Sequence, residues 1–169
     1  MPASKISLDN AKKNKLFYFI ANAHVYRKED GRCLMLKRDP REVAHPGRYA
    51  TPGGKLEWSD MDLENPGRVN SDILDYPDGV ETMLRREIME EAGIEVGDEW
   101  KYVCSVLYLR PDETPVVLIK LAVEYRSGDV VLEKGSFTDH AWVTPEEIDE
   151  KGYDCVDGMK EEIAKTISL

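Results

Sequence analysis

The sequence lacks the features that would place it in a membrane or in an oxidising compartment. It has no run of the ~18 apolar residues that a transmembrane helix needs, and residues 1–15 lack the apolar core of a signal peptide. Its cysteines are only three, Cys33, Cys104 and Cys155, and none forms a CxxC pair. A disulfide framework or a zinc site is therefore not expected. We expect a cytoplasmic protein with free thiols.

Positive charge is also scarce. The chain has 23 lysines and arginines against 33 acidic residues, a net charge of −10. This balance argues against binding to nucleic acid or to anionic membranes, since both need a basic surface. It does not exclude a small phosphorylated ligand, because a bound divalent cation can reverse the local field.

The pattern of apolar runs indicates a mixed α/β chain of one domain. Residues 1–16 are polar and lysine-rich, and we expect a flexible N-terminal lead-in before a single domain over residues 17–169. Two runs, 17–26 and 32–37, are typical of strands, and the KEDG sequence between them is a hairpin signal.

The second half of the chain repeats this pattern. The runs 100–110 and 115–126 predict a second hairpin around the PDET turn, and residues 128–143 predict one or two more short strands. Thr144 and Pro145 are typical of a helix start, and an amphipathic helix is expected at the C-terminus. Residues 59–77 are acidic and show no clear periodicity, so we interpret them as a loop or insertion.

The central helix is predicted over residues 79–92. Asp78 and Glu81 have the spacing of a capping box, and Gly93 is a typical helix stop. Apolar residues at four-residue steps predict its buried stripe. These are Val80, Leu84 and Ile88.

The same helix carries a cluster of carboxylates. Glu87, Glu90 and Glu91 lie at i, i+3 and i+4, so their side chains share one face. Three carboxylates together suit a hard cation such as Mg²⁺ or Mn²⁺. Taken alone, the helix also fits a solvated acidic face, balanced by Arg85 and Arg86.

Two segments together resemble the Nudix box, whose usual form is Gly, five residues, Glu, seven residues, then Arg-Glu-apolar-x-Glu-Glu-x-Gly-apolar. Residues 52–57, PGGKLE, resemble its beginning. Its second half is matched at every defined position, by Arg86, Glu87, Ile88, Glu90, Glu91, Gly93 and Ile94. The insertion splits the box, and either Asp78 or Asp60 stands in place of the first glutamate. The resemblance implies a Nudix-like α/β/α sandwich with a mixed β-sheet.

The resemblance also implies an activity. By this resemblance the chain would be a metal-dependent pyrophosphohydrolase. Such an enzyme cleaves a diphosphate linkage in a nucleoside diphosphate derivative, such as a nucleoside triphosphate, ADP-ribose or a nucleotide sugar. Mg²⁺ (or Mn²⁺) would be held by Glu87, Glu90 and Glu91, with the carbonyl of Gly53 or Gly54 as a further ligand. Arg86 would hold the glutamates in position, and the general base would be Glu91 or, from a downstream loop, Glu133.

Other residues have two interpretations each. Arg38 and Arg48 could clamp phosphate or be ordinary surface arginines, and Tyr49 could stack on a base or pack in the core. The alternative function is a non-catalytic nucleotide-sensing or protein-binding module on the same fold. Homodimers are frequent among the proteins that this chain resembles, so a homodimer is a further expectation.

Overall fold

The structure is a computed structural model that describes residues 3–7 and 13–169. A short 3-10 helix, η1 (Lys13–Lys15), precedes the first strand. The predicted lead-in over residues 1–16 falls partly outside the described residues and stays a prediction.

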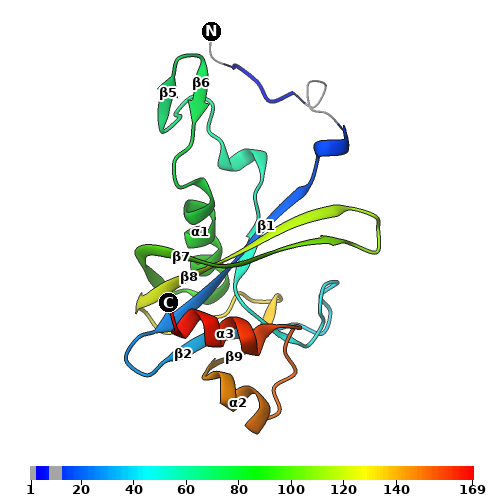
Figure 1. The fold of residues 1–169 in the computed structure, drawn as a ribbon, viewed down its shortest axis with the longest axis vertical. Helices are drawn as coiled ribbons and strands as arrows, with labels where there is room; N and C mark the ends of the chain where they lie inside the picture. Colours follow the sequence, from blue (N-terminus) through cyan, green and yellow to red (C-terminus); the bar gives the residue numbers. More distant parts are fainter. Residues whose placement is uncertain (1–2, 8–12) are drawn as a thin grey trace.

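A seven-stranded mixed sheet forms the middle of the molecule (Figure 1). Its main order is β3-β2-β1-β8-β7, with β4 paired to β1 and β9 paired to β2. Strand β8 runs parallel to β1, and the β1–β2 and β7–β8 pairs are antiparallel. The two predicted hairpins are therefore confirmed. The strands are β1 (Tyr18–Arg27), β2 (Arg32–Arg38), β3 (Tyr49–Ala50), β4 (Gly53–Lys55), β7 (Glu95–Leu109), β8 (Pro115–Ser127) and β9 (Phe137–Val143).

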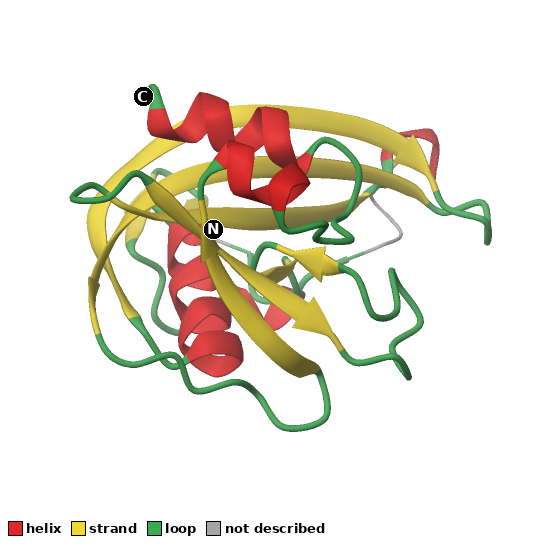
Figure 2. Cartoon of the chain, turned by 90° about the horizontal axis from the view of Figure 1, so that it is seen from below, coloured by secondary structure: helices red, strands yellow, loops and turns green. Residues whose placement is uncertain are grey.

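Helices cover both faces of this sheet, as Figure 2 shows. Helix α1 (Gly79–Ala92) packs on one face, and α2 (Pro145–Glu150) and α3 (Met159–Ile167) pack on the other. The predicted sandwich with a mixed sheet is thus confirmed. None of the helices in the described part of the chain is long and apolar enough to cross a membrane.

Strand β2 contributes to both cores. Its residues Cys33, Leu34, Met35 and Leu36 are all fully buried. Because successive side chains of a strand point to opposite faces, Leu34 and Leu36 join the core under α1, while Cys33 and Met35 join the core under α2 and α3. A strand that is covered on both faces needs apolar residues at every position, which explains the continuous apolar sequence CLML.

Helix α1 has the predicted bounds but a different start. Leu84 and Ile88 are fully buried, and Gly93 ends the helix in the left-handed conformation with its N–H donating to the carbonyl of Met89. Asp78 occupies the N-cap position, yet its φ of 55° is left-handed and its side chain makes no capping bond. The predicted capping box is therefore wrong, because such a cap needs an extended residue at this position.

The insertion contains more structure than the sequence predicted. It begins at the 3-10 helix η2 (Trp58–Asp60) and includes a separate hairpin of β5 (Arg68–Asn70) and β6 (Ile73–Asp75). Each strand is three residues long and mostly exposed, so neither could show a two-residue periodicity. The prediction of a loop is corrected accordingly.

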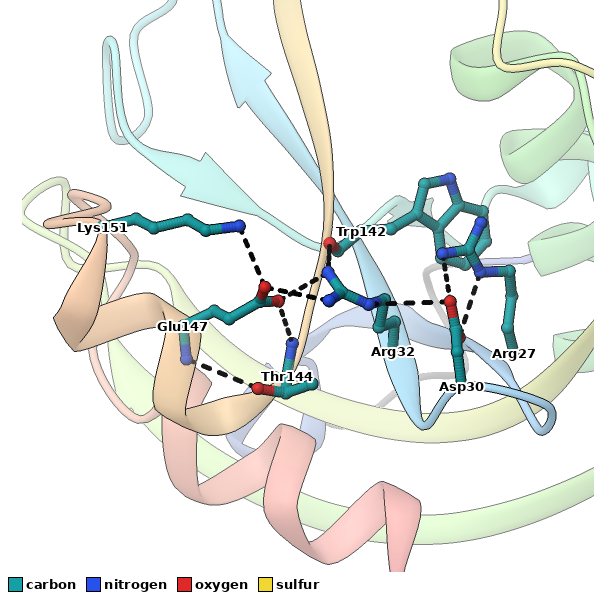
Figure 3. Close-up of polar contacts among 7 residues, drawn as sticks. All are labelled: Arg27, Asp30, Arg32, Trp142, Thr144, Glu147 and Lys151. Atoms are coloured by element: carbon teal, nitrogen blue, oxygen red, sulfur yellow. Dashed lines mark hydrogen bonds and ion pairs between the residues drawn. The ribbon is translucent and has the colours of Figure 1, made fainter.

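A carboxylate network fastens α2 to the sheet, as Figure 3 shows. Thr144 and Glu147 form a capping box at the start of α2. The Glu147 carboxylate also accepts two hydrogen bonds from the Arg32 guanidinium, at 2.6 and 2.9 Å, and one from Lys151 at 2.9 Å. Lys151, the Thr144 N–H and Arg32 together lower the pKa of Glu147 to about 2.

Replacing Glu147 with Gln is expected to lower the melting temperature by a few degrees at neutral pH. A carboxyl with a lowered folded-state pKa stabilises the protein above its unfolded pKa, and this contribution is lost as the pH falls toward 2. The difference between wild type and variant should therefore shrink below about pH 5. Thermal unfolding across pH measures it, with the exposed neighbour Glu146→Gln as control. A difference that stays constant down to pH 2 would contradict the assignment.

Candidate active site

Two glutamates of α1 lie against strand β4. The Glu91 carboxylate accepts a hydrogen bond from the Gly53 N–H at 2.9 Å. Glu87 lies so close to Gly54 that a Cβ added there would be 2.4 Å from the Glu87 carboxyl carbon. Pairing of β4 with β1 fixes these two glycines, with Gly54 opposite Ala21. The fold therefore joins the two halves of the box that the insertion separates in sequence.

Burial changes the acidity of both carboxyls. It raises the pKa of Glu91 to about 8, and the Glu87 charge adds to this, while the Gly53 N–H and Arg38 act in the opposite direction. Burial likewise raises the pKa of Glu87, against the effect of Arg86. Positive charge supplied at this point would lower both pKa values again, because it favours the ionised carboxylates.

Arg86 contacts three acidic side chains. Its Nη1 lies 2.8 Å from Glu87 Oε1 and 3.5 Å from Glu90 Oε2, and its Nη2 lies 3.2 Å from Asp60 Oδ1. It thus links the exposed side of α1 to the end of η2. These contacts fit a residue that orients the glutamates.

Asp60 is the better match for the missing glutamate of the box. Five residues separate it from Gly54, as the box requires, and it contacts Arg86. Asp78, the other candidate, sits at the start of α1 without a side-chain cap bond. The extra residues of the split box are therefore 61–78, which follow Asp60.

The site supplies the oxygen ligands that a hard divalent cation prefers, but it is not assembled as a three-carboxylate cluster. The Glu90 side chain is 54% exposed, against 16% for Glu87. Within residues 3–7 and 13–169, no group of three or more His, Cys, Asp or Glu side chains is arranged to hold a metal ion. The close approach of Glu87 to Gly54 and the raised pKa of Glu91 nevertheless fit a cation at this point, since positive charge would favour both ionised carboxylates.

Two predicted residues lie beside Glu91. The Glu133 N–H donates to the Glu91 carbonyl at 3.1 Å, and the Glu133 charge contributes to the raised pKa of Glu91. Arg38 acts on the same carboxyl with opposite sign, although its guanidinium also binds Glu42 and the Ala44 carbonyl. Both remain candidates for the site.

The side chains of Arg48 and Tyr49 make contacts outside the site. Arg48 binds Asp154 at 3.0 Å and Asp157 at 2.9 Å. Tyr49 is buried, donates its hydroxyl to Asp139 at 2.6 Å and packs edge-on against Tyr153. For both, these contacts agree with the structural alternative, and substrate binding stays a prediction.

Sequence reasoning missed a hollow beside the site. It measures about 580 Å³ and lies between the insertion and the start of α1, with Asp60, Tyr76, Thr82 and Arg86 in its lining. Asp60, at one end of this hollow, could be identified from the sequence, because it has the five-residue spacing from Gly54 that the box requires. The rest of the hollow could not be identified, because the insertion has no periodic pattern to place it.

Comparison with known proteins gives the class of fold. No family model matches the sequence, and no curated protein matches it significantly. Solved structures do match. A MutT Nudix hydrolase from Burkholderia pseudomallei is 20% identical with a TM-score of 0.63, covering 89% of this chain and 98% of its own. The Nudix domain of NrtR from Shewanella oneidensis, solved with ADP ribose, is 14% identical with a TM-score of 0.64, covering 95% and 94%.

An ADP-ribose pyrophosphatase from Streptococcus suis is similar as well, at 13% identity and a TM-score of 0.60 over 90% of this chain and 91% of its own. The match thus extends over nearly the full length of each protein. The chain has the Nudix fold.

Asp60→Asn is expected to lower turnover about 10- to 100-fold, the usual cost of removing a group that orients a metal ligand. Asp60→Glu keeps a carboxylate at this position and should retain most of the wild-type turnover. Asp78→Asn is the matched control and should leave activity unchanged, because asparagine tolerates the left-handed conformation. Steady-state hydrolysis measures all three. Loss of activity in Asp78→Asn with full activity in Asp60→Asn would reverse the assignment.

Gly54→Ala is expected to weaken Mg²⁺ binding about tenfold with little loss of stability. The new methyl group would displace the end of the flexible Glu87 side chain, so the backbone need not move. The increase in melting temperature with Mg²⁺ concentration measures this. Gly79→Ala is the control, since its Cβ would meet nothing nearer than 4.0 Å. An unchanged Mg²⁺ response in Gly54→Ala would contradict the placement of Glu87.

Proposed function

We propose that this protein is a metal-dependent pyrophosphohydrolase that cleaves a diphosphate linkage in a nucleoside diphosphate derivative. The observation that carries the proposal is the placement of two partly buried carboxyls, Glu87 and Glu91, against Gly53 and Gly54. Buried carboxyls are costly unless they are paired or used, and strongly shifted groups cluster at functional sites.

The residues have distinct roles in this proposal. Glu87, Glu90 and Glu91 provide carboxylate oxygens for Mg²⁺ or Mn²⁺, and Gly54 provides space for close approach. A bound divalent cation supplies positive charge to the diphosphate oxygens and makes water more acidic. Arg86 fixes the direction of the glutamates through its contacts with Glu87 and Asp60.

Proton transfer falls to Glu91, with Glu133 as the second candidate. The Glu91 carboxylate, held by the Gly53 N–H at 2.9 Å, is the group placed to accept a proton from an attacking water when it is ionised. Glu133 lies in the loop between β8 and β9, and its N–H donates a hydrogen bond to the Glu91 carbonyl. Arg38, on the same side, is suited to a phosphate oxygen.

A nucleotide is the proposed substrate class. The similar Nudix domain solved with ADP ribose and the similar ADP-ribose pyrophosphatase support a nucleotide ligand, and the MutT proteins support the same chemistry. The substrate within the class remains open between nucleoside triphosphates, ADP-ribose and nucleotide sugars. We infer that residues 17–169 act as one domain and that the acidic insertion at about 59–77 limits access from the side of Asp60 and Arg86.

A non-catalytic nucleotide sensor is the second candidate. The observation that favours it is the exposed position of Glu90, which leaves only two carboxyls against β4. A sensor would bind nucleotide through the same face without turnover.

Release of phosphate and pyrophosphate separates the two functions. We expect turnover of one substrate class with Mg²⁺ or Mn²⁺, in a screen of nucleoside triphosphates, ADP-ribose, nucleotide sugars and dinucleoside polyphosphates. Glu91→Gln should lose about 10²- to 10⁴-fold, the range for a general base. It should remain folded, with an equal or higher melting temperature without metal, because it removes a buried ionisable group.

Glu161→Gln, an exposed change on α3, is the control and should keep full activity. Nucleotide affinity without turnover, retained in Glu91→Gln, would favour the sensor. Absence of both turnover and a Mg²⁺ effect on the melting temperature would contradict both functions and leave the glutamates as a solvated acidic face.

A further inference from the structure

Arg85 binds the start of strand β7 from its place on helix α1. Its Nη1 donates to the Val96 carbonyl at 3.1 Å, and its Nη2 donates to the Gly97 carbonyl at 2.7 Å and to Asp98 Oδ1 at 2.9 Å. The guanidinium carbon also lies 5.5 Å from the centre of the Trp100 ring. One side chain of α1 thus contacts β7 at several points.

This part of β7 is bulged, and the bulge supplies the acceptors. Val96 lies opposite Tyr125 and Trp100 lies opposite Val123, so β7 advances by four residues while β8 advances by two. Extra residues in a bulge are left out of the regular ladder, and buried carbonyls among them need other partners. Arginine presents its donors in a rigid fork, so one guanidinium can bind two carbonyls and a carboxylate together.

Arg85 and the glutamates lie on opposite flanks of α1. Arg85 and Glu87 are two residues apart, which places them about 200° apart around the helix. On the other flank, Glu87 approaches Gly54, and Glu91 accepts the hydrogen bond from the Gly53 N–H, both on β4. In the sheet, β1 and β8 separate β4 from β7. Helix α1 is therefore attached by polar contacts at both flanks, to β7 on one side and to β4 on the other.

The attachment to β7 controls how α1 is rotated about its own axis. The stripe between the two flanks is apolar, with Leu84, Ile88 and Ala92 fully buried. Hydrophobic contacts are not directional, so they hold α1 on the sheet but fix its rotation less sharply than hydrogen bonds do. A rotation of α1 would move its carboxyls relative to β4, and a displacement of ~1 Å at a reacting group can cost about 10²-fold in rate.

We propose that Arg85 is a positioning residue: its bonds to the bulge of β7 set the rotation of α1 and so aim Glu87 and Glu91 at β4. Arg85 touches neither substrate nor metal in this role, in contrast to Arg86, which contacts Glu87 directly. The effect on turnover rests on the proposed hydrolysis, whereas the placement of the glutamates can be measured without it.

Hydrogen exchange of the Gly53 amide, followed by NMR, tests this placement in the absence of metal and substrate. Arg85→Met keeps an apolar side chain of similar length but has no donors. In this variant we expect the Gly53 amide to exchange about tenfold faster than in the wild type, because its bond to the Glu91 carboxylate is weakened. Amides in the pairing of β1 with β8 should not show this acceleration. Arg85→Gln, which cannot bind all three acceptors, should act in the same direction.

Two control variants separate positioning from a general loss of stability. Met159→Ala weakens the core under α2 and α3, away from α1, and should not accelerate exchange at Gly53 selectively. Asp98→Asn removes only the ion pair with Arg85, at a side chain 77% exposed, and should match the wild type. Circular dichroism and thermal unfolding show that each variant is folded.

Turnover is the second measurement, made with the substrate that the wild type hydrolyses. Arg85→Met should lower it about 10- to 100-fold, the usual cost of disturbing groups that orient metal ligands. Met159→Ala should keep it at a temperature where both variants are folded.

Three results would each overturn the proposal. They are unchanged Gly53 exchange in Arg85→Met, an equal acceleration at Gly53 in Met159→Ala or Asp98→Asn, and turnover in Arg85→Met equal to that of the wild type. A wild type without turnover on any substrate would instead count against the hydrolysis, and selective acceleration at Gly53 would still support the placement of the glutamates by Arg85.

Discussion

The hydrogen bond from the Gly53 N–H to the partly buried Glu91 carboxylate is the contact on which the candidate site depends. It joins strand β4 to helix α1, and the close approach of Glu87 to Gly54 lies beside it. Strand β4 is only three residues long and is placed by β1. The position of the glutamates is therefore set by the centre of the sheet, whose geometry does not depend on the length of the loop between Asp60 and α1.

That arrangement explains how the chain tolerates an insertion within a compact motif. Loop closure costs little more for a longer loop, and the ends of this loop are held independently. Arg86 and Asp60 hold one end, and the sheet contacts of α1 hold the other. The hairpin of β5 and β6 makes the added segment a small structured unit on the outside of the site.

Much of the fold followed from the sequence, because periodicity and turn residues report local structure. The bounds of α1, its stop at Gly93 and the two long hairpins were all predictable. The left-handed Asp78 and the hairpin in the insertion were not, since the first depends on how the chain enters α1 and the second is too short to show a period. In the site, spacing identified Glu87 and Glu91, whereas the burial that raises their pKa values, and the bonds that occupy Arg48 and Tyr49, are tertiary effects.

Strand β2 has a consequence for how the molecule unfolds. Its four successive buried residues alternate between the core beneath α1 and the core beneath α2 and α3. A shift of one residue in its pairing would exchange the two sets of side chains, so both cores would lose their packing at once. Loss of β2 from the sheet would therefore disrupt both cores together. The helix that carries the glutamates is in this way coupled to the C-terminal helix on the opposite face, and we expect the domain to lose both in one cooperative transition.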